Sequence, residues 1–213
     1  MYKANLLGAR LLKANLSGAN LNEADLRGAR LSKANMRDTN LTEANLTGAN
    51  LNGVDMQGAT LDQTNLTRAQ FIRADMSDVS MRQANLTKAK CFRADMRGAD
   101  LALANLALAS LQRADFSGAS LMYANLSDAS IISANEAQEI SREKPEGYEK
   151  EQVTRMLNSS NFTDADLTGA DFTNVKAINL IFSDEQHESM KAQPTVKTIA
   201  EWIIFFENEH QDD

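Results

Sequence analysis

Cysteine and histidine, the residue types most often used for nucleophilic catalysis and metal binding, are scarce in this chain of 213 residues. Only Cys91, His187 and His210 are present, too few for the ligand spacing of a zinc site or for a disulfide framework. The sequence also has no glycine-rich phosphate loop and no histidine-containing metal motif. We therefore expect no enzymatic activity, no catalytic or metal-binding residue, and no cofactor.

Arginine offers a different chemistry, because guanidinium groups bind phosphates and carboxylates through paired hydrogen bonds. Arg73, Arg93 and Arg113 recur every twenty residues. They lie close together only if the backbone returns to the same side of the molecule after each twenty residues. The backbone that positions them therefore has to be deduced first.

A five-residue period runs through the chain from Ala4 to Asn135. Every position ending in 1 or 6 from Leu6 to Ile131 is a large apolar residue or Cys91, and the residue two places earlier is nearly always alanine. This period fits neither an amphipathic helix nor an alternating strand. It fits one side of a stacked coil in which four pentapeptides return the chain to its start and neighbouring coils hydrogen-bond about 4.8 Å apart.

In such a coil the large residue, which we call the centre, and the small residue two places before it point inward. The row of methionines at 36, 56, 76 and 96 is then a flexible core filler, and Cys91 is buried and unreactive. Every position ending in 5, from Asn5 to Asn135, is Asn or Asp, which we interpret as side chains that hydrogen-bond the backbone at corners.

The motif Ala-Asn/Asp-Leu-x-x resembles that of the pentapeptide repeat family, over residues 4–135 and more weakly over 155–173. The resemblance implies an all-β solenoid, a right-handed quadrilateral β-helix. We expect the β-helix over residues 1–135 and a charged projecting loop over 136–156, beginning where Glu136 occupies a centre position. A final repeat coil over 157–173 is predicted by Leu157, Phe162, Leu167 and Phe172.

The C-terminal segment, 174–213, contains a predicted α-helix over about 195–208. Among its apolar residues are Trp202, Ile203, Phe205 and Phe206. They predict a cap over the open end of the solenoid, because an uncovered last coil exposes its core and its unpaired backbone. The alternative is a homodimer through this helix, which the resemblance to gyrase-inhibiting family members implies.

Positions separated by four pentapeptides stack on one side, so the charges sort into four faces. One face carries eight basic residues and no acidic one: Arg10, Lys13, Arg30, Lys33, Arg73, Lys90, Arg93 and Arg113. We call it the basic face; Ile72 and Phe92 also point outward from it. Two other faces are predominantly acidic, and the fourth is close to neutral.

These observations favour a non-enzymatic scaffold for protein–protein interaction, in which the basic face and the 136–156 loop meet a protein partner of unknown identity. The alternative, implied by the resemblance, is a DNA-mimicking inhibitor or protector of DNA gyrase or topoisomerase, for which the acidic faces would serve. Direct nucleic-acid binding is the least favoured, because Phe92 is the only aromatic residue between the cations.

The sequence has no continuous apolar run long enough for a transmembrane helix and begins without the apolar core of a signal peptide. We therefore expect no membrane association and a location in the cytoplasm, and the resemblance implies a bacterial one. Residues 1–135 hold 15 basic and 12 acidic residues, against 7 and 17 in the rest of the chain.

Overall fold

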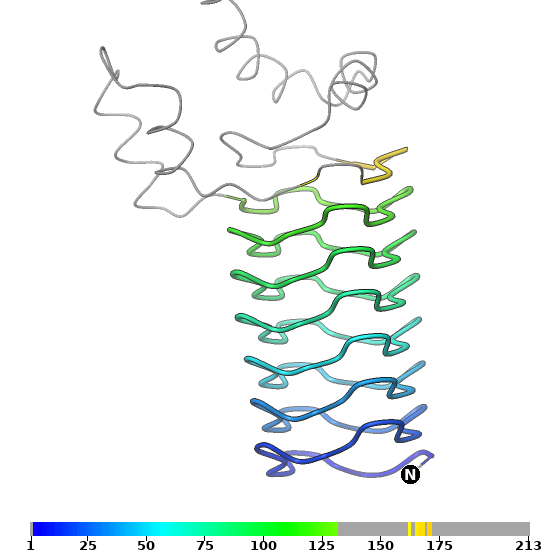
Figure 1. The fold of residues 1–213 in the computed structure, drawn as a ribbon, viewed down its shortest axis with the longest axis vertical. Coiled ribbons are helices and arrows are strands. Elements are labelled where there is room, and N and C mark those ends of the chain that lie inside the picture. The colour runs from blue at the N-terminus through cyan, green and yellow to red at the C-terminus, as the bar shows by residue number, and fades with distance from the viewer. Residues whose placement is uncertain (1, 132–161, 163–164, 169, 172–213) are drawn as a thin grey trace, which may run out of the picture.

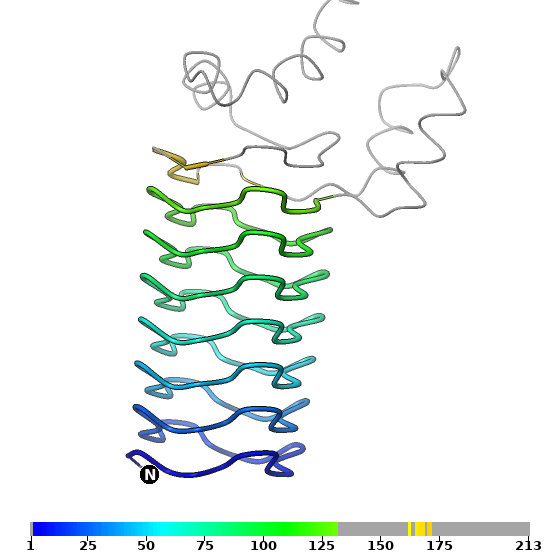
Figure 2. The ribbon, with the colours of Figure 1, turned by 180° about the vertical axis from the view of Figure 1, so that it is seen from behind.

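The computed structural model describes residues 2–131, 162, 165–168, 170 and 171. Over residues 2–131 the chain winds into a stack of coils that starts at the N-terminus (Figure 1). The coils are equally regular on the opposite side of the rod (Figure 2). The β-structure of this part consists of isolated parallel bridges. The described residues form no helix and no strand longer than a single bridge.

Each bridge of this rod joins equivalent positions on consecutive coils, from Asn5 with Asp25 to Ser110 with Ser130. One coil therefore consists of four pentapeptides, and the chain forms a four-sided β-helical solenoid as predicted. The coils are held together by backbone hydrogen bonds in both directions, such as Leu6 N to Asp25 O at 2.7 Å and Asp25 N to Ala4 O at 2.9 Å.

The corners are tight turns that require a left-handed backbone. In the first repeat Ala9 N donates to Leu6 O at 2.9 Å, and Gly8, two places after the centre, has φ of 63°. The equivalent position in each repeat from 3 to 128 also has a positive φ, although most of these residues are not glycine. Lys13 (φ 55°) and Lys33 (φ 58°) are examples, and their side chains point away from the core.

Asparagine and aspartate support these corners. The side-chain oxygen of Asn5 accepts a hydrogen bond from Leu7 N at 3.2 Å, and Asp115 accepts one from Ser117 N at 3.0 Å. The same contact recurs in many other repeats, among them at Asn65, where Thr67 N donates at 3.1 Å. The prediction that these polar residues serve the backbone of the turn is confirmed.

The core is a continuous column of side chains. All centres from Leu21 to Leu126 are fully buried, and so are the methionines that were predicted to fill it. Thr39 and Thr64 replace the usual alanine, and their hydroxyls donate to Leu16 O at 3.0 Å and Leu41 O at 2.8 Å. These bonds satisfy the only two hydroxyls at inward positions of the described part, so the column tolerates them.

The regular spacing of twenty residues between bridge partners ends after Ile131. Ser120 pairs with Asp166 and Asn125 with Asp171, so these two bridges span a longer stretch of chain than all the earlier ones. Phe162 stacks on Phe116, with ring centroids 4.9 Å apart. With a spacing of twenty residues, that place in the core would fall to Glu136. At this place in the core the chain provides a phenyl ring, whereas an unpaired carboxylate would be very costly to bury.

Phe162 and Leu167, two of the centres predicted for the final coil, are buried in the structure. The residues between Ile131 and Phe162 lie outside the described part, and so does the predicted loop over 136–156. The predicted helix over 195–208, with Trp202, Ile203, Phe205 and Phe206, also lies outside it.

Candidate interaction face

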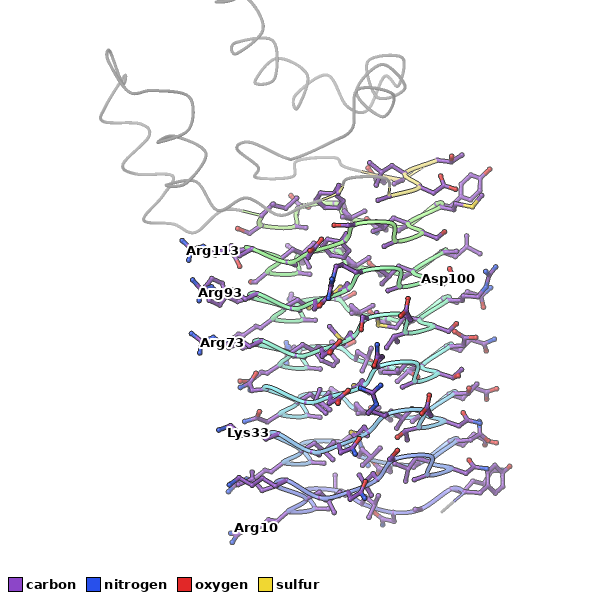
Figure 3. All side chains as sticks on the ribbon, viewed as in Figure 1. Arg10, Lys33, Arg73, Arg93, Asp100 and Arg113 are labelled. Atoms are coloured by element: carbon purple, nitrogen blue, oxygen red, sulfur yellow. The ribbon has the colours of Figure 1, made fainter. Side chains whose placement is uncertain are left out.

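The eight cations of the basic face lie along one side of the rod. Figure 3 shows Arg10, Lys33, Arg73, Arg93 and Arg113 along one edge, with Asp100 on the opposite side. Five of the eight occupy the corner position two places after a centre, where φ is between 55° and 59°: Lys13, Lys33, Arg73, Arg93 and Arg113. The other cations, Arg10, Arg30 and Lys90, occupy the bridge position, and Arg10 pairs directly with Arg30.

The cations of this face differ from the others in their electrostatic partners. The described residues form five ion pairs with one another, all on other faces: Lys3–Glu23, Arg27–Asp25, Arg37–Asp55, Arg82–Asp100 and Arg97–Asp95. Within the same part of the chain, no carboxylate forms an ion pair with seven basic-face cations: Arg10, Lys13, Arg30, Lys33, Arg73, Lys90 and Arg93. These charges therefore face solvent without a counterion among the described residues.

The acidic faces are partly neutralised by their own arginines. The Arg97 guanidinium donates to both oxygens of Asp95, at 2.8 and 2.6 Å, and its hydrogen bonds lower the pKa of that carboxyl. On the fourth, nearly neutral face Arg27 lowers the pKa of Asp25 in the same way. A hydrogen bond from Tyr2, followed by one from Lys3, lowers the pKa of Glu23. The acidic faces therefore carry charges of both signs, whereas the basic face carries positive charges alone.

Phe92 is the aromatic residue of the basic face. The guanidinium carbon of Arg93 lies 5.4 Å from the centroid of its ring, and that of Arg113 lies 5.9 Å away. Both distances are within the range of cation–π attraction. The ring therefore helps to orient two arginines on consecutive coils.

A shallow notch of about 300 Å³ interrupts this face. Its lining consists of Lys33, Asn52, Gly53, Ile72, Arg73 and Phe92. Sequence analysis did not single out Asn52 or Gly53. A signal for Gly53 is present, because it is the only residue without a side chain in the corner row formed by positions 13, 33, 53, 73, 93 and 113.

Cys91 is fully buried beneath this face, and burial raises the pKa of its thiol to about 12. The predicted burial is confirmed. Because the thiolate is the reactive form and is negligible at pH 8, we expect no alkylation of the folded protein by iodoacetamide at that pH. Complete labelling is expected in concentrated guanidinium chloride, a condition chosen to unfold the chain. Intact-mass spectrometry measures both, and labelling of the native protein at the rate of free cysteine would contradict the prediction.

The described residues contain no group of three or more His, Cys, Asp or Glu side chains that could hold a metal ion. In the same part of the chain there is no helix of the length and hydropathy needed to cross a membrane.

Four pentapeptides per coil, a column of Leu and Ala inside and left-handed corners outside define a four-sided β-helix built from pentapeptides. The family model for pentapeptide repeats matches the chain with 8 copies, over residues 1–32, 29–68, 64–102, 99–135 and 156–184. The chain belongs to the pentapeptide repeat family, whose members form right-handed quadrilateral β-helices.

Solved structures of the family are similar to this chain. A pentapeptide repeat protein from the thylakoid lumen of Arabidopsis thaliana is 25% identical, with 65% of this chain and 75% of that chain covered and a TM-score of 0.47. HetL from the cyanobacterium Nostoc, involved in the regulation of heterocyst differentiation, is 27% identical, with 85% and 90% covered and a TM-score of 0.28.

QnrB1, a plasmid-mediated fluoroquinolone resistance protein, is 15% identical, with 87% of this chain and 84% of that chain covered and a TM-score of 0.45. No curated protein matches the chain by sequence.

Proposed function

We propose that this protein is a non-enzymatic interaction scaffold whose basic face binds an acidic surface of a protein partner. The observation that carries the proposal is that seven cations of this face, Arg10, Lys13, Arg30, Lys33, Arg73, Lys90 and Arg93, form no ion pair with a carboxylate of the described residues. Five of the seven cations on the other faces of the described rod are ion-paired. A face that served only solubility would be expected to mix its charges in the same way.

The arrangement of the cations also carries an energetic cost. Bridge partners such as Arg10 and Arg30 stand on adjacent coils, and like charges placed directly opposite each other destabilise paired strands. An acidic partner would relieve that repulsion and accelerate its own association through long-range attraction. The cost is therefore explained if the face is used for binding.

A protein partner fits this face better than a nucleic acid. The outward Ile72 and Phe92 are half-buried between the cations, and an aliphatic side chain adds nothing to phosphate binding. Protein interfaces combine arginine and aromatic residues with apolar contacts of this kind.

The proposal is tested by reversing charge on one face at a time. We expect the double variant Arg73→Glu/Arg93→Glu to lose the proteins that the full chain captures from a lysate of its source cells. The matched control is Arg68→Glu/Lys88→Glu, which changes the same net charge at the same corner conformation on the neighbouring face. Quantitative mass spectrometry of the captured proteins is the measurement.

Neither double variant is expected to change the free energy of unfolding by more than about 1 kcal/mol, because all four side chains are exposed. Equal capture by the two variants, whether retained or lost, would refute a role specific to the basic face.

The second candidate function is mimicry of DNA toward gyrase or topoisomerase. It is favoured by one observation, the stacking of Asp55, Asp75, Asp95 and Asp115 on successive coils of one acidic face. Two of these carboxylates are, however, ion-paired with Arg37 and Arg97. We therefore expect no inhibition of gyrase supercoiling and no protection from a fluoroquinolone at micromolar protein, and either effect would favour mimicry over the scaffold.

A further inference from the structure

The notch on the basic face is the place where one member of the corner row lacks a side chain. Lys33 lies one coil before Gly53 and Arg73 one coil after it, so the backbones that carry these two cations are separated by roughly 10 Å. Between them, Gly53 leaves a floor of backbone, and the volume of about 300 Å³ opens above it. A space of this kind admits one small group between two positive charges.

The polar side chains around the notch are all hydrogen-bond donors. The ammonium of Lys33 and the guanidinium of Arg73 have no acceptor atoms. The side-chain oxygen of Asn52 already accepts a hydrogen bond from Ile72 N at 2.9 Å, which leaves the Asn52 amide group its NH₂ donors. No carboxylate is among the lining residues. The chemistry of this lining therefore selects an acceptor with negative charge.

The remaining wall of the notch is apolar. Ile72 and Phe92 stand on consecutive coils beside the two cations, and both are half-buried. The ring of Phe92 also contacts the guanidinium groups of Arg93 and Arg113, which help to hold it in place. A ligand that places an anion beside Arg73 would therefore bring its next group against an aliphatic and an aromatic side chain.

We propose that the notch at Gly53 binds a carboxylate side chain of an acidic peptide segment in which an apolar residue adjoins the carboxylate. The carboxylate lies between Lys33 and Arg73, and the apolar neighbour packs on Ile72 and Phe92. This inference rests on the proposed function, since it names the partner chemistry of the same face. It adds that recognition depends on a gap in the row of cations as well as on their total charge.

Gly53→Lys separates these two ideas. It adds a positive charge to the face and at the same time fills the gap. The backbone accepts lysine there, because Lys13 and Lys33 hold the same conformation in the same row, with φ of 55° and 58° against 63° at Gly53. A Cβ at Gly53 would meet Lys33 Cγ at 3.6 Å, an ordinary van der Waals contact.

The experiment is a titration of the ¹⁵N-labelled full chain with two unlabelled octapeptides of equal charge, (Asp-Leu)₄ and (Asp-Ser)₄, followed by amide chemical shifts. We expect (Asp-Leu)₄ to shift the amides of Gly53, Ile72 and Arg73 and to bind at least fivefold more tightly than (Asp-Ser)₄. Gly53→Lys is expected to weaken (Asp-Leu)₄ at least tenfold. Phe92→Ser is expected to reduce the preference for (Asp-Leu)₄ over (Asp-Ser)₄ at least twofold.

The control is Gly48→Lys, which adds the same charge at the same left-handed conformation on the neighbouring face, with φ of 67° and no atom within 4 Å of the new Cβ. It should bind (Asp-Leu)₄ as the parent does. Equal or tighter binding by Gly53→Lys would overturn the proposal, and so would equal affinity for the two peptides. Tighter binding of a dodecamer of deoxythymidine than of (Asp-Leu)₄, with a steep loss in salt, would overturn it in favour of nucleic acid.

The proposed function has its own readout, the capture lost in Arg73→Glu/Arg93→Glu. If capture is lost there but is unchanged in Gly53→Lys, the scaffold stands and the notch is refuted. If the two peptides bind as expected while capture is the same in both charge-reversal variants, the notch stands and the scaffold is refuted.

Discussion

Phe116→Ala is expected to lower the free energy of unfolding by about 3–5 kcal/mol. The side chain is fully buried, and its ring stacks on Phe162 with an interplanar angle of 9°. Removing it opens a cavity at the point where the last described coil rests on the rod. Because a solenoid is stabilised mainly by contacts between neighbouring coils, the loss is concentrated at that junction.

Two measurements check this prediction. Urea denaturation gives the change in the free energy of unfolding, and hydrogen exchange reports the amides of Asp166 and Asp171, which donate to Ala119 O and Ala124 O at 2.8 Å. We expect both amides to lose protection before those of the preceding coils. Phe92→Ala, the same substitution at an outward position, should cost under about 1 kcal/mol. Similar costs for the two variants would show that Phe116 is not part of the core.

Ala84→Leu is expected to lower the free energy of unfolding by about 1–3 kcal/mol, through overpacking. Ala84 is fully buried, and backbone hydrogen bonds of 2.9 Å join the adjacent coils on both sides of it, from Asn85 N to Thr64 O and from Asn105 N to Ala84 O. Coils held at this distance cannot separate locally to admit a larger side chain. The additional carbons of leucine therefore force displaced backbone or strained rotamers.

The control for this variant is Ala84→Thr. Thr64, one coil earlier in the same column, is fully buried and donates its hydroxyl to Leu41 O at 2.8 Å. A threonine at 84 can reach the equivalent carbonyl of Leu61, so we expect a cost under about 1 kcal/mol. Thermal and urea denaturation of both variants measure the difference, and a leucine variant as stable as the parent would mean that the column is more compliant than its spacing indicates.

The position of each core residue could be predicted from the sequence because a five-residue period leaves few choices. Once the centres from Leu6 to Ile131 are placed inward, the alanines two positions earlier follow, and the outward charges sort themselves by their place within each set of four pentapeptides. The structure confirms the coil length and the burial of the centres from Leu16 to Ile131, while Leu6 and Leu11 in the first coil are half-buried. The alignment of Arg73 and Arg93 on one face follows from the same arithmetic.

Features that depend on what a side chain meets could not be predicted in this way. The gap that Gly53 leaves in the row of cations is visible in the sequence, but the walls that Asn52, Ile72 and Phe92 give the notch appear only in the structure. The contact between Phe92 and two guanidinium groups depends on rotamers, which a repeat does not specify. The stacking of Phe162 on Phe116 depends on where the chain rejoins the rod after the additional stretch.

The place where the chain rejoins the rod, at Phe162, determines which changes of chain length the solenoid can accept. Because Phe162 stands where Glu136 would otherwise fall, positions 134 and 135 followed directly by 162–172 read Ala-Asn-Phe-Thr-Asp-Ala-Asp-Leu-Thr-Gly-Ala-Asp-Phe, an unbroken run of the repeat. The entropy of closing a loop rises only slowly with its length. We therefore expect that the residues between 135 and 162 can be replaced by a segment of another length or sequence while the coils on both sides keep their register.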